Sequence, residues 1–348
     1  MRYNCFVMKK TNTFNNHFSV KTITKIAHSI LTFLILILIS SCGYNEESEF
    51  IPPPSLTADF DGEPLLGAQP LTVNFTDHSS GDITSYEWDF NNDGIVDSTT
   101  RGNVSNQYTD TGTFSVKLRV TNASGSDERE RTEYITVIPG SGLQLWLRAD
   151  SIMGLNDGDP VDEWTDSSGN GNNATQTGGN RPTYRTDIIN GRPVVRFNGS
   201  TNYLDFTSIN MQPATVFAVV KYELPAVNAP FLGNDTNNSY VGYYDNTIYY
   251  YSTVGNMNVA NTTPAAFQII TAHAQPPGSN SSIRIDGSPV VSGNYNWGTS
   301  TFVFIGRRNT ERFEGDIAEV LIYSTNLNST EIDEVEDYLS SKYTIAIP

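Results

Sequence analysis

Short runs of alternating apolar and polar residues, separated by turn residues, fill this chain from residue 56 onward. Side chains of a β-strand point alternately to the two faces of a sheet, so a period of two predicts strands with one buried face. The regular spacing of these runs is typical of antiparallel β-sandwiches. The first group of expected strands covers residues 71–75, 84–90, 113–120 and 133–137.

A second β-rich segment begins after a short hinge at residues 139–142 and runs to the last residue. Its expected strands include residues 193–197, 215–222, 282–286, 301–305 and 317–323. The chain is thus expected to be all-β, with one sandwich followed by another.

One helix is expected near the C-terminus. Asn328 or Ser329 can cap it, and Ile332, Val335 and Leu339 then fall at positions i, i+3 and i+7 of one face. Acidic residues cluster in its first turns, where the helix dipole favours negative charge.

The first 41 residues have the composition of an export signal. They contain five basic residues and no acidic one, and residues 30–39 are almost purely apolar. Ten helical residues span only about 15 Å and cannot cross a hydrocarbon core of about 30 Å, so this run is a signal segment and not a membrane span. The small residues before Cys42 resemble a bacterial lipoprotein signal, although an ordinary secretory signal with a chance cysteine is the alternative.

The lipoprotein resemblance implies that residues 1–41 are removed and that Cys42 carries the lipid. Cys5 then leaves with the signal, and no disulfide or cysteine metal site can form within the mature chain. Loss of five positive charges would also change the formal charge from −17 to −22. A surface of that charge excludes nucleic acid as a partner.

Residues 42–56 are acidic and then proline-rich, which predicts a flexible tether. Their acidic start resembles the export tags of Bacteroidetes surface lipoproteins, and a plain solvated linker is the other interpretation. The expected location is therefore the outer membrane or the cell surface, with the membrane reached through the lipid.

Two pieces of the first β-rich segment form a recognisable pattern: residues 86–90 with Asp93-Gly94, and residues 108–122 with Gly125-Ser126. Through these pieces, residues 57–138 resemble the polycystic kidney disease (PKD) type of immunoglobulin-like domain. This resemblance implies a non-catalytic spacer or adhesion module.

Four pieces of the second β-rich segment form another recognisable pattern: residues 145–150, 164–174, 195–199 and 313–323. Through these pieces, residues 143–348 resemble the laminin-G-like, concanavalin A-like jelly roll. The resemblance implies a fold that serves lectins, carbohydrate-binding modules, adhesins and some enzymes, so it leaves the function open.

One loop has the oxygen spacing of a calcium site. Calcium prefers six to eight oxygen ligands, and Gly94 at the sixth position permits the sharp turn. Thr100 stands where an EF-hand has glutamate, so a helical EF-hand is excluded, and an aspartate-glycine β-turn is the alternative. The candidate ligands are Asp89, Asn91, Asp93, the Ile95 carbonyl and Asp97.

A second candidate calcium loop contains Asp166 and Asn170 among several glycines. The jelly-roll resemblance implies an additional acid from a late strand, with Asp316 and Glu319 as the candidates. The alternative is that Asp166 and Asn170 only satisfy turn backbone groups.

Sugar binding needs exposed aromatic faces with amides and carboxylates around them. Six tyrosines lie within residues 240–251, and strand alternation predicts that about half of them belong to the core. Tyr244 and Trp297 are the predicted solvent-facing ligand contacts, whereas Trp88, Trp146 and Trp164 are expected in cores.

Catalysis finds little support in the sequence. His78 and His273 lie in no Ser-His-Asp arrangement, no strand shows the alternating acids of a jelly-roll glycosidase, and the acids of residues 331–337 are expected on a solvated helix face. We therefore expect a non-enzymatic lipoprotein that binds carbohydrate or another extracellular ligand. The alternatives are an adhesion protein that recognises proteins and a polysaccharide-active enzyme.

The anchor can be tested by replacing Cys42 with alanine. Cys42→Ala should yield soluble or unprocessed protein, because no thiol remains to accept the lipid. Membrane fractionation and mass spectrometry of the N-terminus measure this. Unchanged membrane partitioning of a cleaved Cys42→Ala protein would contradict the prediction.

Overall fold

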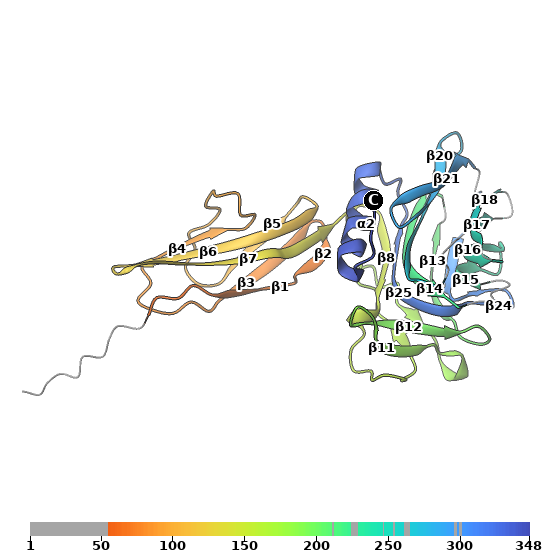
Figure 1. The fold of residues 1–348 in the computed structure, drawn as a ribbon, viewed down its shortest axis with the longest axis horizontal. Coiled ribbons are helices and arrows are strands. Elements are labelled where there is room, and N and C mark those ends of the chain that lie inside the picture. The colour runs from red at the N-terminus through yellow and green to blue at the C-terminus, as the bar shows by residue number, and fades with distance from the viewer. Residues whose placement is uncertain are drawn as a thin grey trace, which may run out of the picture. The chain divides into compact units, whose positions relative to one another are not determined.

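A computed structural model describes residues 55–348 apart from residues 211, 224–228, 246, 253–254, 261–264, 296–297 and 299–300. Within this part of the chain, strands dominate and one α-helix is present (Figure 1). That helix is too short and polar to cross a bilayer. The all-β expectation with a single late helix is confirmed.

The N-terminal sandwich consists of a three-stranded sheet, in the order β1-β3-β5, and a four-stranded sheet, in the order β2-β7-β6-β4. All pairings are antiparallel except the parallel pair of β2 and β7. The strands are β1 (Phe60–Glu63), β2 (Leu66–Ala68), β3 (Leu71–Asp77), β4 (Ser85–Asp89), β5 (Val104–Tyr108), β6 (Gly112–Asn122) and β7 (Gly125–Ile138).

Aromatic rings fill the core of this sandwich. Trp88 is fully buried and lies 5.3 Å from Phe60, 5.7 Å from Phe75 and 5.8 Å from Phe90, measured between ring centroids. Its indole N–H donates to the carbonyl of Thr100, so burial leaves no polar atom of this ring unpaired. The expected core role of Trp88 is confirmed.

The C-terminal sandwich has two larger sheets. One, here named the helix-covered sheet, has the order β11-β12-β25-β14-β19-β20-β21, with β8 also paired to β25. Its strands are β8 (Leu143–Arg148), β11 (Thr183–Ile189), β12 (Arg192–Asn198), β14 (Ala214–Tyr222), β19 (Gln268–Ala274), β20 (Asn280–Ile285), β21 (Ser288–Asn294) and β25 (Glu314–Tyr323).

The other, here named the open sheet, has the order β18-β17-β16-β15-β22-β13-β10-β9. Two 3-10 helices and a small hairpin, β23–β24, complete the domain: η1 (Ala149–Ser151), η2 (Gly178–Asn180), β23 (Arg307–Arg308) and β24 (Glu311–Arg312). The strands of the open sheet are β9 (Glu163–Trp164), β10 (Ala174–Thr175), β13 (Leu204–Asn210), β15 (Ala229–Asn234), β16 (Ser239–Tyr244), β17 (Thr247–Ser252), β18 (Gly255–Ala260) and β22 (Thr301–Ile305).

The main core lies between these two sheets, and β14 shows how the sequence specifies it. Val216, Ala218 and Val220 belong to the core between the sheets, whereas Phe217 and Val219 belong to a second cluster on the opposite face. A strand buried on both faces needs a continuous apolar run, which residues 214–220 largely supply. The nine expected strand runs all lie in strands, with ends shifted by a few residues.

Helix α2 (Ser329–Tyr343) covers the outer face of the helix-covered sheet. Asn328 caps it, and the side chain of Glu331 returns to the Asn328 backbone N–H to complete a capping box. Ile332, Val335 and Leu339 are buried against the sheet, as the spacing predicts. Figure 1 shows α2 beside β8 and β25, with β15–β18 on the far side of the sandwich.

A buried carboxylate joins this helix to the sheet. Glu319 of β25 is fully buried, and its oxygens accept hydrogen bonds from the indole N–H of Trp146, 2.6 Å away, and from the hydroxyl groups of Tyr338 and Tyr343 at 2.8 Å. Lys342 adds an ion pair at 2.7 Å. Four donors therefore compensate for the loss of hydration of this charge.

The acids of residues 331–337 are not all solvated, and that expectation is wrong for Glu336. Its side chain is only 1% exposed, accepts a hydrogen bond from Thr271 and forms an ion pair with Arg284 at 2.7 Å. Burial raises the pKa of Glu336, while the bonds from Thr271 and Arg284 oppose the rise. The helix position alone could not reveal this, because the partners come from β19 and β20.

Glu319→Ala should destabilise the C-terminal sandwich by about 3 kcal/mol, because it leaves the buried donors of α2 without their acceptor. Denaturant titration of the full chain, followed by tryptophan fluorescence, measures the free energy of unfolding. Glu314→Ala is the matched control, since Glu314 lies on the same strand with an exposed side chain. Equal stability of the two variants would show that the Glu319 cluster does not hold the helix.

Candidate functional site

The tyrosine-rich hairpin of β16 and β17 divides its rings between two faces. Tyr243 and Tyr250 point into the core between the sheets and are fully buried. The remaining four, Tyr240, Tyr244, Tyr249 and Tyr251, lie outside that core and are here named the tyrosine face. Two of the six tyrosines therefore belong to the core, and Tyr240 is buried outside it, so the core share is slightly smaller than the expected half.

The rings of the tyrosine face contact one another. Tyr240 and Tyr251 have centroids 5.4 Å apart and planes 30° apart, and Tyr240 and Tyr249 are 6.3 Å and 34° apart. Tyr244 stands almost perpendicular to Tyr249, with an interplanar angle of 87° at 6.0 Å. Three rings thus form a gently tilted floor, and Tyr244, which is 43% exposed, forms a wall at one end.

The floor lies on the outer side of the open sheet, as the pairing of residues across neighbouring strands shows. Residues paired across neighbouring strands point to the same face, so the whole row shares one surface. From β10 to β18 the row consists of Thr175, Asp205, Phe304, Gly233, Tyr240, Tyr251 and Asn256.

Two amides border the floor on β18. Asn256 is paired with Tyr251 and Asn258 with Tyr249, and both asparagines are exposed. Neither side chain makes a hydrogen bond to a described residue of the chain. Each amide offers two donors and one acceptor beside an aromatic ring.

The β23–β24 hairpin forms the other wall. It packs on Gly233, where a Cβ atom would lie 2.2 Å from the carbonyl oxygen of Arg307. Arg308 then places its guanidinium 4.1 Å from the centre of the Tyr240 ring and forms an ion pair with Glu311 at 2.5 Å. The sequence analysis missed this hairpin, because charged turn residues usually face solvent.

Burial raises the pKa of Tyr240 to about 12, with Glu311 adding to the rise and Arg308 opposing it. The hydroxyl group of Tyr240 therefore keeps its proton at neutral pH and can donate a hydrogen bond. Of the two predicted ligand contacts, Tyr244 lies in the tyrosine face, whereas Trp297 falls outside the described residues. Trp146 and Trp164 are buried, as expected.

In the first predicted calcium loop, backbone N–H groups bind the carboxylates. Asp89 accepts hydrogen bonds from the backbone of Asp93 at 3.2 Å and of Gly94 at 2.9 Å, and Asp97 accepts one from Phe90 at 2.6 Å. Asn91 and Asp93 are joined by a side-chain bond of 3.0 Å, and Ile95 is 67% exposed. These contacts explain the shape of the turn, and each carboxylate oxygen retains a further lone pair.

The second predicted loop is hydrogen-bonded to β8. Asp166 accepts hydrogen bonds from the backbone of Trp146 and Asn172, and the Asn170 amide donates to the carbonyl of Leu143. Asp166 and Asn170 thus both satisfy backbone groups of β8.

The structure does not bring Asp316 and Glu319, the two predicted additional ligands, to this loop. Asp316 is 1% exposed and receives two hydrogen bonds from Arg196, at 2.6 and 2.8 Å, across the β12–β25 pair. Glu319 belongs to the cluster beneath α2. Each acid has a separate set of partners, a consequence of strand register that the sequence does not display.

The two histidines of the described residues, His78 and His273, each contact polar side chains. His78 lies 3.3 Å from the exposed Asp61, and His273 is hydrogen-bonded to Asn326 and Gln275. Burial lowers the pKa of His273, so its imidazole is neutral at pH 7. No group of three or more His, Cys, Asp or Glu side chains among the described residues is arranged to hold a metal ion.

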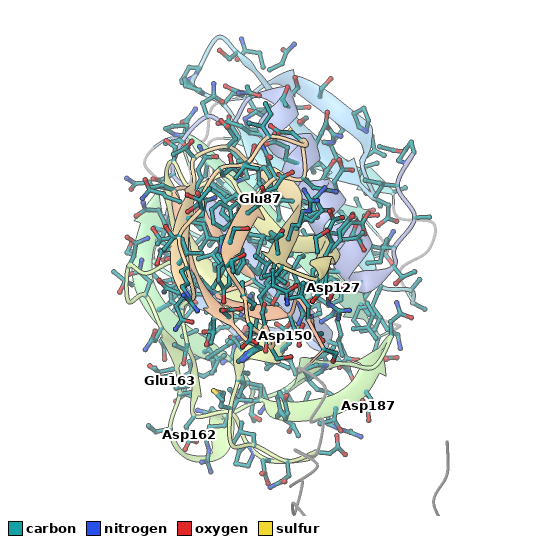
Figure 2. The ribbon with its side chains drawn as sticks, turned by 90° about the vertical axis from the view of Figure 1, so that its left-hand side faces the viewer. Glu87, Asp127, Asp150, Asp162, Glu163 and Asp187 are labelled. Carbon is teal, nitrogen blue, oxygen red and sulfur yellow. The ribbon has the colours of Figure 1, made fainter. Side chains whose placement is uncertain are left out.

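Acidic side chains are spread over both sandwiches. Glu87 and Asp127 belong to the first, and Asp150, Asp162 and Asp187 to the second (Figure 2).

A family comparison identifies the N-terminal sandwich. Residues 52–137 match the profile of the PKD domain family. The first sandwich is therefore of the PKD type. The PKD1 domain of the Vibrio cholerae metalloprotease PrtV is 34% identical to the chain, covering 24% of this chain and 96% of that domain with a TM-score of 0.20.

Other solved structures match a larger share of the chain than the PKD match covers. Domain 4 of an extracellular arabinanase from Geobacillus stearothermophilus, solved with arabinotriose, is 17% identical and covers 56% of this chain and 98% of that domain, with a TM-score of 0.43. The receptor-binding domain of botulinum neurotoxin type G is 19% identical, with a TM-score of 0.41; the match covers 57% of this chain and 52% of that structure. No curated protein sequence matches the chain.

We still predict that residues 89–97 of the first sandwich bind calcium. If the loop binds the ion, chelator should lower the melting temperature of the calcium-loaded protein, because a ligand bound only to the folded state stabilises it. Differential scanning calorimetry measures the shift, and Asp93→Ala should remove it. An unchanged melting temperature in chelator would contradict calcium binding.

Proposed function

We propose that this chain is a lipid-anchored, non-catalytic protein of the cell envelope whose C-terminal sandwich binds carbohydrate through the tyrosine face. In this proposal Cys42 carries the anchor and residues 42–56 form a tether. The PKD domain serves as a spacer that moves the binding domain away from the membrane. One lipid chain anchors a protein only marginally, so a multiply acylated cysteine suits such a role.

The tyrosine face is the observation that supports carbohydrate binding. Sugar rings present C–H surfaces that pack on aromatic faces, and their hydroxyl groups need donors and acceptors at the rim. Tyr249 and Tyr251 supply accessible ring surface, and Asn256 and Asn258 supply exposed amides beside them. Core packing requires neither the rings nor the amides, because all four side chains lie outside the buried cluster between the sheets.

Removal of a ring from the tyrosine face should weaken binding. Each aromatic contact contributes about 0.5–1.5 kcal/mol, so Tyr249→Ala and Tyr244→Ala should each reduce affinity about 2- to 10-fold. The measurement is titration calorimetry with a glycan selected on an array of immobilised glycans. Tyr203→Ala is the matched control, because Tyr203 stacks on Arg307 beyond the β23–β24 hairpin.

Three results would overturn parts of the proposal. Full affinity of Tyr249→Ala together with a loss in Tyr203→Ala would move the site to the other side of the hairpin. Absence of glycan binding with retention of a protein ligand would establish the adhesion alternative. Release of reducing ends from polysaccharides would establish an enzyme.

A further inference from the structure

The tyrosine face has a limited length and a definite charge, and these two properties restrict the carbohydrate it can take. We propose that it binds a neutral oligosaccharide and recognises a segment of two sugar units. This inference rests on the proposed function and specifies the ligand of the same site.

The length follows from the strand that carries the floor. Tyr249 and Tyr251 are two residues apart on β17, so their attachment points are separated by about 6.6 Å along the strand. That separation suits two consecutive sugar rings, each over one tyrosine.

The floor is bounded on two sides. Beyond Tyr249 the ring of Tyr244 stands at 87° to the floor, so a further stacked unit at that end would meet it. On the β16 side, Arg308 lies 4.1 Å from the Tyr240 ring centre and 5.9 Å from the Tyr251 ring centre, which leaves Tyr249 and Tyr251 as the accessible rings of the floor. The β18 side, with its exposed asparagines, stays open.

The preference for a neutral ligand follows from ion pairs within the protein around the floor. Arg308 is paired with Glu311, and Arg307 is paired with Asp235. The third arginine of the hairpin, Arg312, donates to the carbonyls of Asn309 and Glu311. Asp205 also interacts electrostatically with Arg307, so three acids accompany the three arginines. With the chain as a whole at −17, no surplus positive charge favours a uronic or sialic acid.

The polar groups that remain suit hydroxyl groups. Asn256 and Asn258 can each donate to one sugar hydroxyl and accept from another, and they are opposite Tyr251 and Tyr249, one amide for each ring. The pairing of one amide with one aromatic ring in each of two rows is consistent with two sugar subsites.

A chain-length series tests this inference. Neutral gluco-, xylo-, manno- and arabino-oligosaccharides of one to five units, and a galacturonic acid series of the same lengths, are titrated into the full-length protein. We expect affinity for the preferred neutral series to rise at least 10-fold from one unit to two and less than 3-fold from two units to five. The galacturonic acid series should bind at least 10-fold more weakly.

Variants locate the effect. Tyr251→Ala should abolish the gain from one unit to two, whereas Tyr251→Phe should retain it because the stacking surface remains. Tyr203→Ala should also retain the gain. A normal circular dichroism spectrum of Tyr251→Ala, with an unchanged melting transition, shows that the domain is folded.

The outcomes separate this inference from the proposed function. A continued rise in affinity through four or five units, or preference for the galacturonic acid series, would overturn the inference and leave carbohydrate binding intact. If no oligosaccharide of any length bound the folded protein, both would be wrong.

Discussion

The buried carboxylate of Glu319 determines which surface of the C-terminal sandwich is left for a ligand. By accepting hydrogen bonds from Trp146, Tyr338 and Tyr343 and an ion pair from Lys342, it joins α2 to β25. The helix then buries the outer face of one sheet, and the strands beneath it are apolar on both sides. The outer face of the other sheet is the broad surface on which aromatic side chains can remain accessible.

Much of the architecture could be predicted from the sequence, because strand alternation and helix capping are local signals. The runs at residues 215–222 and 317–323 and the cap at Asn328 were identified from neighbouring residues alone. The PKD resemblance of residues 57–138 agrees with the family match at residues 52–137. The buried state of Glu336 could not be predicted, because its partners Thr271 and Arg284 lie more than 50 residues away in the chain.

The candidate site shows the same limit. Its tyrosines were visible as a cluster within residues 240–251, and Tyr244 was correctly expected at the surface. The walls and rim come from segments whose registers no local pattern encodes: Gly233 on β15, Asn256 on β18 and Arg308 on the hairpin. Asp316 was expected beside Asp166 for the same reason, since sequence shows which acids exist but not which strands face one another.

The packing of the β23–β24 hairpin on Gly233 affects which residues of this domain can be substituted. The hairpin is six residues long, is held by stacking and ion pairs on the outside of the sheet, and contributes no residue to the core between the sheets. Its residues can therefore be exchanged without disturbing the packing that keeps the sandwich folded, provided the glycine beneath it is kept. One short surface segment could thus vary in sequence while the scaffold stays constant.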